Sequence, residues 1–205
     1  PKALLAANQV SANPTLLRLV RRIAVLAKRD GLDSDGVVLL RAQLQADLQG
    51  LWTVLTASGA NQLHIHLAPG VISLLRMHRP EAWGDQLDDI RHLVDQVQRT
   101  GQPVQGLEVG RHGSGIRGIV PIRAGPEYDS PVIASVEVGY GMLPELRQLD
   151  LELGAGLALM LRQPSLDGVM LEMDQHDLAR FGQGEWLLDQ YSRREILDWR
   201  NTGQL

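Results

Sequence analysis

The chain of 205 residues contains no cysteine, which excludes thiol chemistry, disulfides and cysteine-based metal sites. It also has no apolar run approaching the roughly 18 to 20 residues of a membrane-spanning helix; the densest run, residues 155–161, is far too short. Basic residues are not in excess, because 20 Lys and Arg stand against 24 Asp and Glu. This balance does not indicate a nucleic-acid-binding protein. No secretory signal peptide is recognisable, and a start at Pro1 is typical of a fragment.

The first sixty residues predict two amphipathic helices. Asn13 is a suitable helix cap and Pro14 occupies the first helical position, after which apolar residues recur at helical spacing as far as Gly31. A second apolar stripe extends over residues 34–57. We therefore expect residues 1–60 to form an N-terminal helical stalk.

The next segment, residues 61–141, predicts an antiparallel sheet with one helix. Apolar positions at helical spacing indicate a helix over 86–99, with Asp85 as its cap. Pro69 and Gly70 separate two strand-like runs and favour a hairpin between them. The expected strands cover residues 61–67, 72–78, 104–109, 116–123 and 131–139.

Residues 142–205 predict a connecting helix followed by a second, small or partial module. The pattern indicates a helix over 142–153, a strand over 156–161 and a short helix over 174–181, with no clear period beyond residue 185. The expected fold class is α+β, with long N-terminal helices packed on an antiparallel sheet and a smaller or incomplete α/β module after it.

Imidazole and guanidinium side chains are concentrated on the predicted sheet. Alternation along a strand puts His64 and His66 on one face, and likewise Arg76 and His78 on the next strand. Arg76 and Arg117 stand mid-strand among apolar residues, where a charge is costly unless it is paired. Two explanations remain open: an anionic ligand, or ion pairs within the chain. The candidate internal partners are Asp85, Asp88, Glu108 and Glu137.

A metal site is the less favoured interpretation of the same histidines. His64, His66 and His78, completed by Glu108 or Asp85, would offer suitable metal ligands. A guanidinium on the neighbouring strand is, however, a poor neighbour for a metal ion. Structural roles, in which one imidazole packs against the helices and another binds backbone, are also possible. We predict no metal site and no cofactor.

Two further motifs do not indicate chemistry. Residues 113–118 match the G-x-G-x-x-G fingerprint, but the β-branched, proline-interrupted run 116–122 cannot begin the required helix. We expect a strand-connecting turn there and no bound nucleotide. Ser73, His78 and Asp85 could be combined into a triad, yet neither a nucleophile elbow nor an oxyanion hole is recognisable. We expect no enzymatic activity in this segment.

Several motifs follow one another between residues 61 and 139. They are His64–Gly70, Leu74–Pro80, Trp83–Leu87, Arg91, Gly106–Arg111, Gly115–Pro121 and Ser135–Gly139. In this order they resemble Cache-type (double Cache, PAS-like) sensor domains, the extracytoplasmic modules of bacterial chemotaxis transducers, sensor kinases and diguanylate cyclases. The resemblance covers roughly residues 10 to 160.

The resemblance implies a ligand-sensing domain of a transmembrane receptor. In such domains a pocket between a PAS-like sheet and the helix and loop after its second strand binds small carboxylates such as acetate or pyruvate. Arg76, as the main donor, His78 and Arg91 stand at matching positions. We extend the expected ligand-binding set by His66, Trp83, Asp85 and Arg117 from the same region.

The resemblance also implies a periplasmic location, a homodimer formed through the N-terminal helices, and membrane spans that lie outside this sequence. No nucleic-acid partner is expected. An alternative function keeps the same fold without a ligand: a structural or dimerisation module whose pocket is closed by its own side chains. An open or a filled pocket would distinguish the two.

Overall fold

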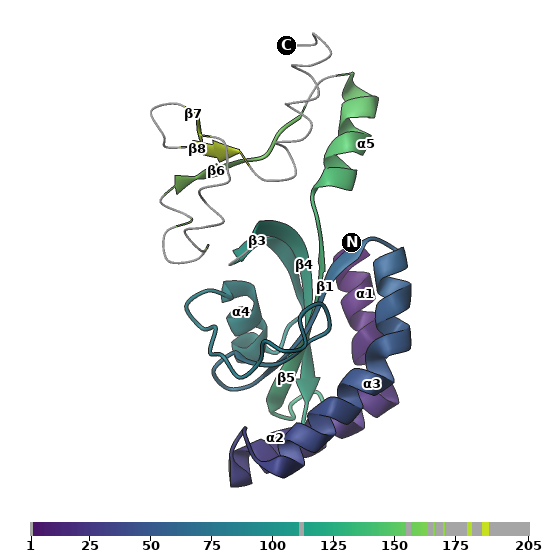
Figure 1. Cartoon of the computed structure of the whole chain (residues 1–205), viewed down its shortest axis with the longest axis vertical. Coiled ribbons are helices and arrows are strands. Elements are labelled where there is room, and N and C mark those ends of the chain that lie inside the picture. The colour runs from purple at the N-terminus through teal and green to yellow at the C-terminus, as the bar shows by residue number, and fades with distance from the viewer. Residues whose placement is uncertain are drawn as a thin grey trace. The chain divides into compact units, whose positions relative to one another are not determined.

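The computed structural model describes residues 2–110, 113–154, 157–163, 166, 170, 180–181 and 186–188. The chain divides into two compact units, one made of Pro1–Gly106 and Ile116–Tyr140, the other of Leu107–Gly115 and Gly141–Leu205. Helices at the N-terminus and a five-stranded sheet (Figure 1) confirm the expected α+β fold class. Within the described residues, no helix has the length and apolar character needed to cross a membrane.

Three helices precede the sheet: α1 (Lys2–Ser11), α2 (Pro14–Asp30) and α3 (Asp35–Ala57). The predicted cap of α2 is confirmed, because the Asn13 side chain accepts hydrogen bonds from the backbone N–H groups of Thr15 and Leu16 at 2.9 and 3.1 Å. Gly31, with φ of 92°, follows the last residue of α2. Helix α1 lies within residues 1–60, which were expected to be helical, but no separate helix was predicted before Asn13.

The sheet contains β1 (Ala60–Leu67), β2 (Ile72–Arg76), β3 (Val104–Gly110), β4 (Gly113–Arg123) and β5 (Val132–Tyr140). Their order is β2-β1-β5-β4-β3, and β1–β2, β1–β5 and β4–β5 pair antiparallel. The last strand, β5, therefore lies at the centre of the sheet, between β1 of the hairpin and β4. The predicted hairpin and all five predicted strands are confirmed, with shifted ends.

Two of those ends correct the sequence-based expectations. Strand β2 ends at Arg76, so His78 lies in the following turn and does not share a strand face with Arg76. The turn is closed by hydrogen bonds from Arg79 N to Arg76 O and from Ala82 N to Arg79 O. The residues 113–118 belong to strand β4 and not to a turn. The helix required by the dinucleotide fingerprint does not begin there.

Helix α4 (His92–Thr100) is shorter than predicted. Residues 86–91 are held in turns instead, because Leu87 N bonds to Val71 O at 3.1 Å and Arg91 N bonds to Leu87 O at 2.8 Å. Asp85 does not cap this helix. Its carboxylate accepts hydrogen bonds from the Arg76 guanidinium.

The two faces of the sheet differ in chemistry. One face packs against α1–α3 in an apolar core that includes Leu63, Ile65 and Val136. Helix α4 covers the other face (Figure 1), where Gln98 donates to Leu67 O at 3.1 Å and to Ser135 Oγ at 3.4 Å. This second face carries buried polar side chains. We call it the polar face; its residues are Gln62, His64, His66, Ser73, Arg117, Ser135 and Glu137.

The second unit contains α5 (Leu143–Leu153), β6 (Met160–Arg162), β7 (Arg180–Phe181) and β8 (Trp186–Leu188), with the strand order β6-β8-β7. Helix α5 confirms the predicted helix 142–153. The strand expected over 156–161 overlaps β6 only at Met160 and Leu161, because residues 157–159 belong to no strand and residue 156 lies outside the described residues. Of the helix predicted over 174–181, residues 174–179 lie outside the described residues, and the last two belong to β7.

The contact between α1 and β4 gives a first prediction. A Cβ atom at Gly118 would overlap the backbone of Ala3 and Leu4, which no side-chain rotation can relieve. We expect Gly118→Ala to lower the unfolding free energy by about 1–3 kcal/mol. At Gly50 on α3 a Cβ atom would have no other atom within 4 Å, so Gly50→Ala should be neutral or stabilising. Urea unfolding of both variants measures the difference; equal stabilities would contradict the packing of α1.

Candidate functional site

The register of the strands assembles the polar face. His64 on β1 lies opposite Glu137 on β5 and opposite Arg76 on β2. His66 lies opposite Ser135 and Ser73 on the same two strands. Because side chains alternate along strands, these partners point to the same side of the sheet. His64, His66, Ser73, Ser135 and Glu137 are all 0% exposed.

Glu137 is the centre of this arrangement. Its Oε2 lies 2.9 Å from His66 Nε2, and its Oε1 accepts a hydrogen bond from Gln62 Nε2 at 2.8 Å. Two guanidiniums lie farther from Oε1: Arg117 Nε at 3.6 Å and Arg91 Nη1 at 3.7 Å. The imidazole therefore contacts one oxygen, and the amide and the cations contact the other.

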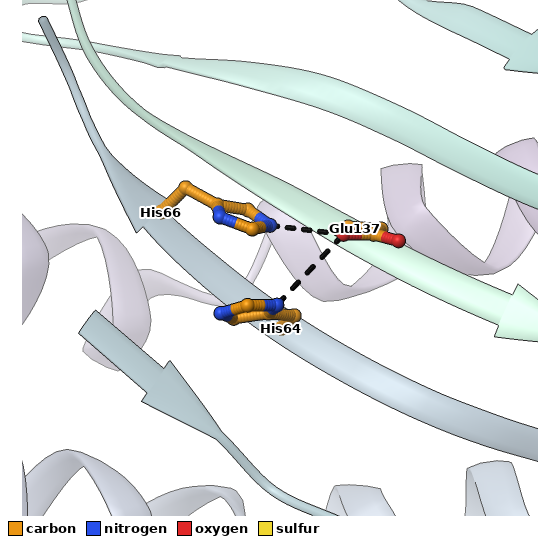
Figure 2. A group of neighbouring side chains, drawn as sticks. All are labelled: His64, His66 and Glu137. Carbon is orange, nitrogen blue, oxygen red and sulfur yellow. Dashed lines mark hydrogen bonds and ion pairs between the residues drawn. The ribbon is translucent and has the colours of Figure 1, made fainter. Parts of the chain in front are cut away.

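The two imidazoles lie next to each other beside the carboxylate (Figure 2), with ring centroids 3.7 Å apart and ring planes tilted by 39°. His64 Nε2 lies 2.8 Å from Ser73 Oγ, and its Nδ1 lies 3.9 Å from Glu137 Oε2. Within the described part of the chain, Nδ1 of His64 and Nδ1 of His66 are buried without a hydrogen-bond partner. Buried polar atoms of this kind are uncommon and indicate a water, ion or ligand at the site.

The electrostatics of the site fix its protonation state. Burial lowers the pKa of His64 well below its ordinary value, and the charges of Arg76 and Arg91 act in the same direction. Burial also lowers the pKa of His66, although its hydrogen bond to Glu137 opposes this. Burial alone would raise the pKa of Glu137, but Arg91, His66 and Arg117 together hold it far below its usual range. At neutral pH the site therefore contains two neutral imidazoles and one carboxylate anion.

Arg76 and Asp85 form a closed ion pair. Arg76 Nη1 and Nη2 donate to the two Asp85 oxygens, each at 2.8 Å, and Nη1 also donates to Ala82 O at 2.6 Å. Of the two explanations left open by the sequence, internal ion pairing is the one observed for Arg76, and also for Arg117 with Glu137. The pair fastens the segment between β2 and α4 onto the sheet.

Two of the expected ligand-binding residues lie towards α3. The exposed His78 has its ring centroid 6.3 Å from that of His64 and 6.5 Å from that of Trp52. Trp83 packs against Arg41 of α3, whose guanidinium carbon lies 4.6 Å from the ring centroid. The structure thus brings His66, Arg91 and Arg117 to one carboxylate, and places the other four expected residues around the segment after β2.

The central carboxylate was not singled out from the sequence. Glu137 was considered only as an internal ion-pair partner, and Gln62 was not considered. A signal exists in the run Ser135–Gly139, where valines alternate with polar residues and place one carboxylate on the face opposite the valines. On β1, Gln62 stands two residues before His64, which stands two residues before His66. This spacing predicts that Gln62 lies on the same face as the two histidines.

Comparison with known families identifies this arrangement of elements. The sequence model of the double sensory domain of two-component sensor kinases matches residues 6–170, which is most of the chain. The chain belongs to this double Cache family. The resemblance seen in the sequence is therefore confirmed. Double Cache domains of sensor kinases are extracytoplasmic sensory modules and are not themselves catalytic.

A solved structure supports the same fold. The crystal structure of the sensor domain of the V. cholerae histidine kinase DctB has a TM-score of 0.50 to this double Cache domain, at 12% sequence identity. The similarity covers 69% of this chain and 48% of the DctB chain. This double Cache domain therefore spans about half the length of that structure, and an identity this low shows the fold alone. A search of curated proteins found no match.

Proposed function

We propose that this domain senses a small organic anion, an acetate- or pyruvate-like carboxylate, on the polar face beneath α4. The observation that supports the proposal is the surroundings of Glu137. Two guanidiniums from different elements, Arg91 before α4 and Arg117 on β4, lie within 4 Å of one buried carboxylate oxygen. Surroundings that keep one carboxylate ionised in a buried position suit a second carboxylate as well.

The distances divide the roles among the arginines. Charge-assisted N–H···O bonds are usually about 2.7–2.9 Å long, so the contacts of Arg91 and Arg117 with Glu137, at 3.7 and 3.6 Å, are longer than such bonds. Arg117 also donates through Nη1 to the side-chain oxygen of Gln62. Arg76 is instead held bidentately by Asp85. We therefore assign the main contacts with the ligand carboxylate to Arg91 and Arg117, in place of Arg76, with His66 beside them. Arg76 and Asp85 hold the connecting segment, and His78 and Trp83 border it on the α3 side.

In the proposed receptor, ligand binding shifts the equilibrium between two conformations of the domain. A ligand can do so only through different affinities for the two states. Arg91 stands at the N-terminus of α4, so a carboxylate bound there ties that helix to the sheet. We further propose a homodimer through the N-terminal helices, where Leu5, Leu39 and Val54 are exposed apolar side chains. Membrane spans and the output domain belong to other parts of the receptor.

A second candidate function is a structural or dimerisation module without a ligand. Internal ion pairing favours it, because Asp85 and Glu137 already lie against Arg76, Arg91 and Arg117. In that case the side chains of the polar face stabilise one conformation and bind nothing. The two candidates differ in whether a carboxylate binds to the isolated domain.

Calorimetry of the 205-residue protein with acetate, pyruvate and lactate tests the proposal. We expect one of these anions to bind, and Arg91→Ala to remove about 2–5 kcal/mol of binding free energy, which is roughly 30-fold to several-thousand-fold in affinity. The matched control is Arg22→Ala, on the exposed side of α2, which should bind like the wild type. Unchanged affinity in Arg91→Ala would refute the assignment, and the absence of binding by the wild type supports the structural module.

A further inference from the structure

Three fully buried ligand atoms converge on the polar face from two neighbouring strands. His64 and His66 on β1 and Glu137 on β5 can each offer one atom, and these atoms all lie within 4.8 Å of one another. Figure 2 shows that each ring turns one nitrogen towards the carboxylate. We propose that His66 Nε2, His64 Nδ1 and Glu137 Oε2 bind a divalent transition-metal ion of the Zn²⁺, Co²⁺ or Ni²⁺ class.

The separations between these atoms suit such an ion. Glu137 Oε2 lies 2.9 Å from His66 Nε2 and 3.9 Å from His64 Nδ1. A tetrahedral ion with bonds of about 2.0–2.2 Å requires ligand atoms roughly 3.3–3.6 Å apart. The two observed separations lie on either side of that value, so small side-chain rotations of the rings bring both into range. Strand pairing of His64 with Glu137 supplies this proximity through the backbone.

The second observation is the unsatisfied nitrogen of His64. Its Nδ1 is buried, has no hydrogen-bond partner within the described residues, and faces Glu137 Oε2. The other ring nitrogen lies 2.8 Å from Ser73 Oγ. When Nε2–H donates to Ser73, Nδ1 presents a lone pair to a carboxylate oxygen, which is unfavourable unless a cation lies between them. The Ser73 hydroxyl then serves as the outer partner that orients a metal-binding imidazole.

The neighbouring charges determine which ions the site can take. Arg91, Arg117 and Gln62 contact Oε1 and leave Oε2 to the imidazoles. The positive charge of the two guanidiniums weakens the binding of any cation, which disfavours Mg²⁺ and Ca²⁺ and favours ions that form strong bonds to imidazole. Arg76, the reason for expecting no metal from the sequence, is neutralised by Asp85.

Coordination requires one change of tautomer. In the metal-free site, neutral His66 carries its proton on Nε2, where it donates to Glu137. Coordination through Nε2 moves this proton to Nδ1, so the imidazole stays neutral and no net proton is released from it. Three protein ligands leave one coordination position for water or another small ligand.

The test uses the untagged 205-residue protein after treatment with a chelator. Titration with Co²⁺, followed by visible absorption, and with Zn²⁺, followed by calorimetry, should show one bound ion per chain. We expect His66→Ala and Glu137→Gln to weaken binding by at least about 100-fold, and Ser73→Ala by about 10-fold. The control is His92→Ala, an exposed histidine at the start of α4, which should leave the affinity unchanged.

NMR spectroscopy of the wild-type protein tests the same site without any substitution, so it remains informative if a variant does not fold. Zn²⁺ should shift the ¹⁵N resonances of the His64 and His66 imidazoles and leave that of His92 in place. Shifts confined to other imidazoles, no binding at 1:1 stoichiometry, or full affinity in a folded Glu137→Gln variant would each overturn the proposal. None of these outcomes depends on whether a carboxylate binds.

Discussion

Replacing Glu137 by alanine is expected to lower the unfolding free energy by about 3–5 kcal/mol, the usual cost of breaking a buried ion pair from one side. Glu137 is 0% exposed, and the side chains of Arg91 and Arg117 beside it are only 11% and 7% exposed. The substitution removes an anion that lies within 4 Å of both guanidiniums. It also removes the acceptor for the hydrogen bonds from Gln62 and His66.

A control substitution at the surface shows whether the loss of stability comes from the buried position of Glu137 or from the removal of any carboxylate. Asp30 forms an exposed ion pair with Arg29 at 2.6 Å, and exposed pairs of this kind contribute little because solvent screens them. Asp30→Ala should therefore leave urea unfolding almost unchanged. If Glu137→Ala unfolds at the same urea concentration as Asp30→Ala, the buried network does not stabilise the fold.

The parts of the fold that follow local rules were predictable from the sequence. Asn13 before Pro14 begins α2 as expected, and α4 ends at Thr100, one residue from the predicted end, before Gly101 in a left-handed conformation with φ of 64°. These signals depend on only a few neighbouring residues. The alternation along β1 was likewise sufficient to place His64 and His66 on one face.

Features that depend on distant partners were not predictable in the same way. Residues 86–91 have the apolar spacing of a helix, but Gln86 forms a bridge with Ile72 on β2, and this backbone pairing competes with helix formation. Which carboxylate pairs with which arginine also depends on the register. Asp85 was a helix-cap candidate in the sequence and is the partner of Arg76 in the structure.

Lowering the pH is expected to destabilise the folded protein, which is the second large effect. In buffer containing a chelator, we expect the unfolding free energy to fall by about 1–2 kcal/mol between pH 6.5 and pH 5.5 through His64 and His66. Both imidazoles are fully buried, and burial lowers the pKa of each below the ordinary value of 6.5. Protonation of either ring in the folded protein would place a cation in a site already flanked by Arg76 and Arg91.

The sign follows from proton uptake by the two states. Below pH 6.5 the unfolded chain binds protons at these histidines while the folded protein does not, so lowering the pH favours unfolding. The stabilisation is complete above pH 6.5 and is lost as the pH falls. Glu137 acts at lower pH: its pKa is held below the ordinary value of 4.5, so the stability contributed by its ionised form is lost only in more acidic solution.

Urea unfolding at a series of pH values, on the wild type and two variants, measures this contribution. The double variant His64→Gln, His66→Gln should show a smaller loss of stability between pH 6.5 and pH 5.5, because glutamine does not titrate. Part of the loss remains in the double variant, because desolvation also lowers the pKa of His78, to about 4. His92→Gln removes an exposed histidine and should retain the full loss. The groups facing the two imidazoles, Glu137, Arg76, Arg91 and His78, are unchanged in all three proteins. An undiminished loss in the double variant would show that the buried imidazoles are not the groups that titrate.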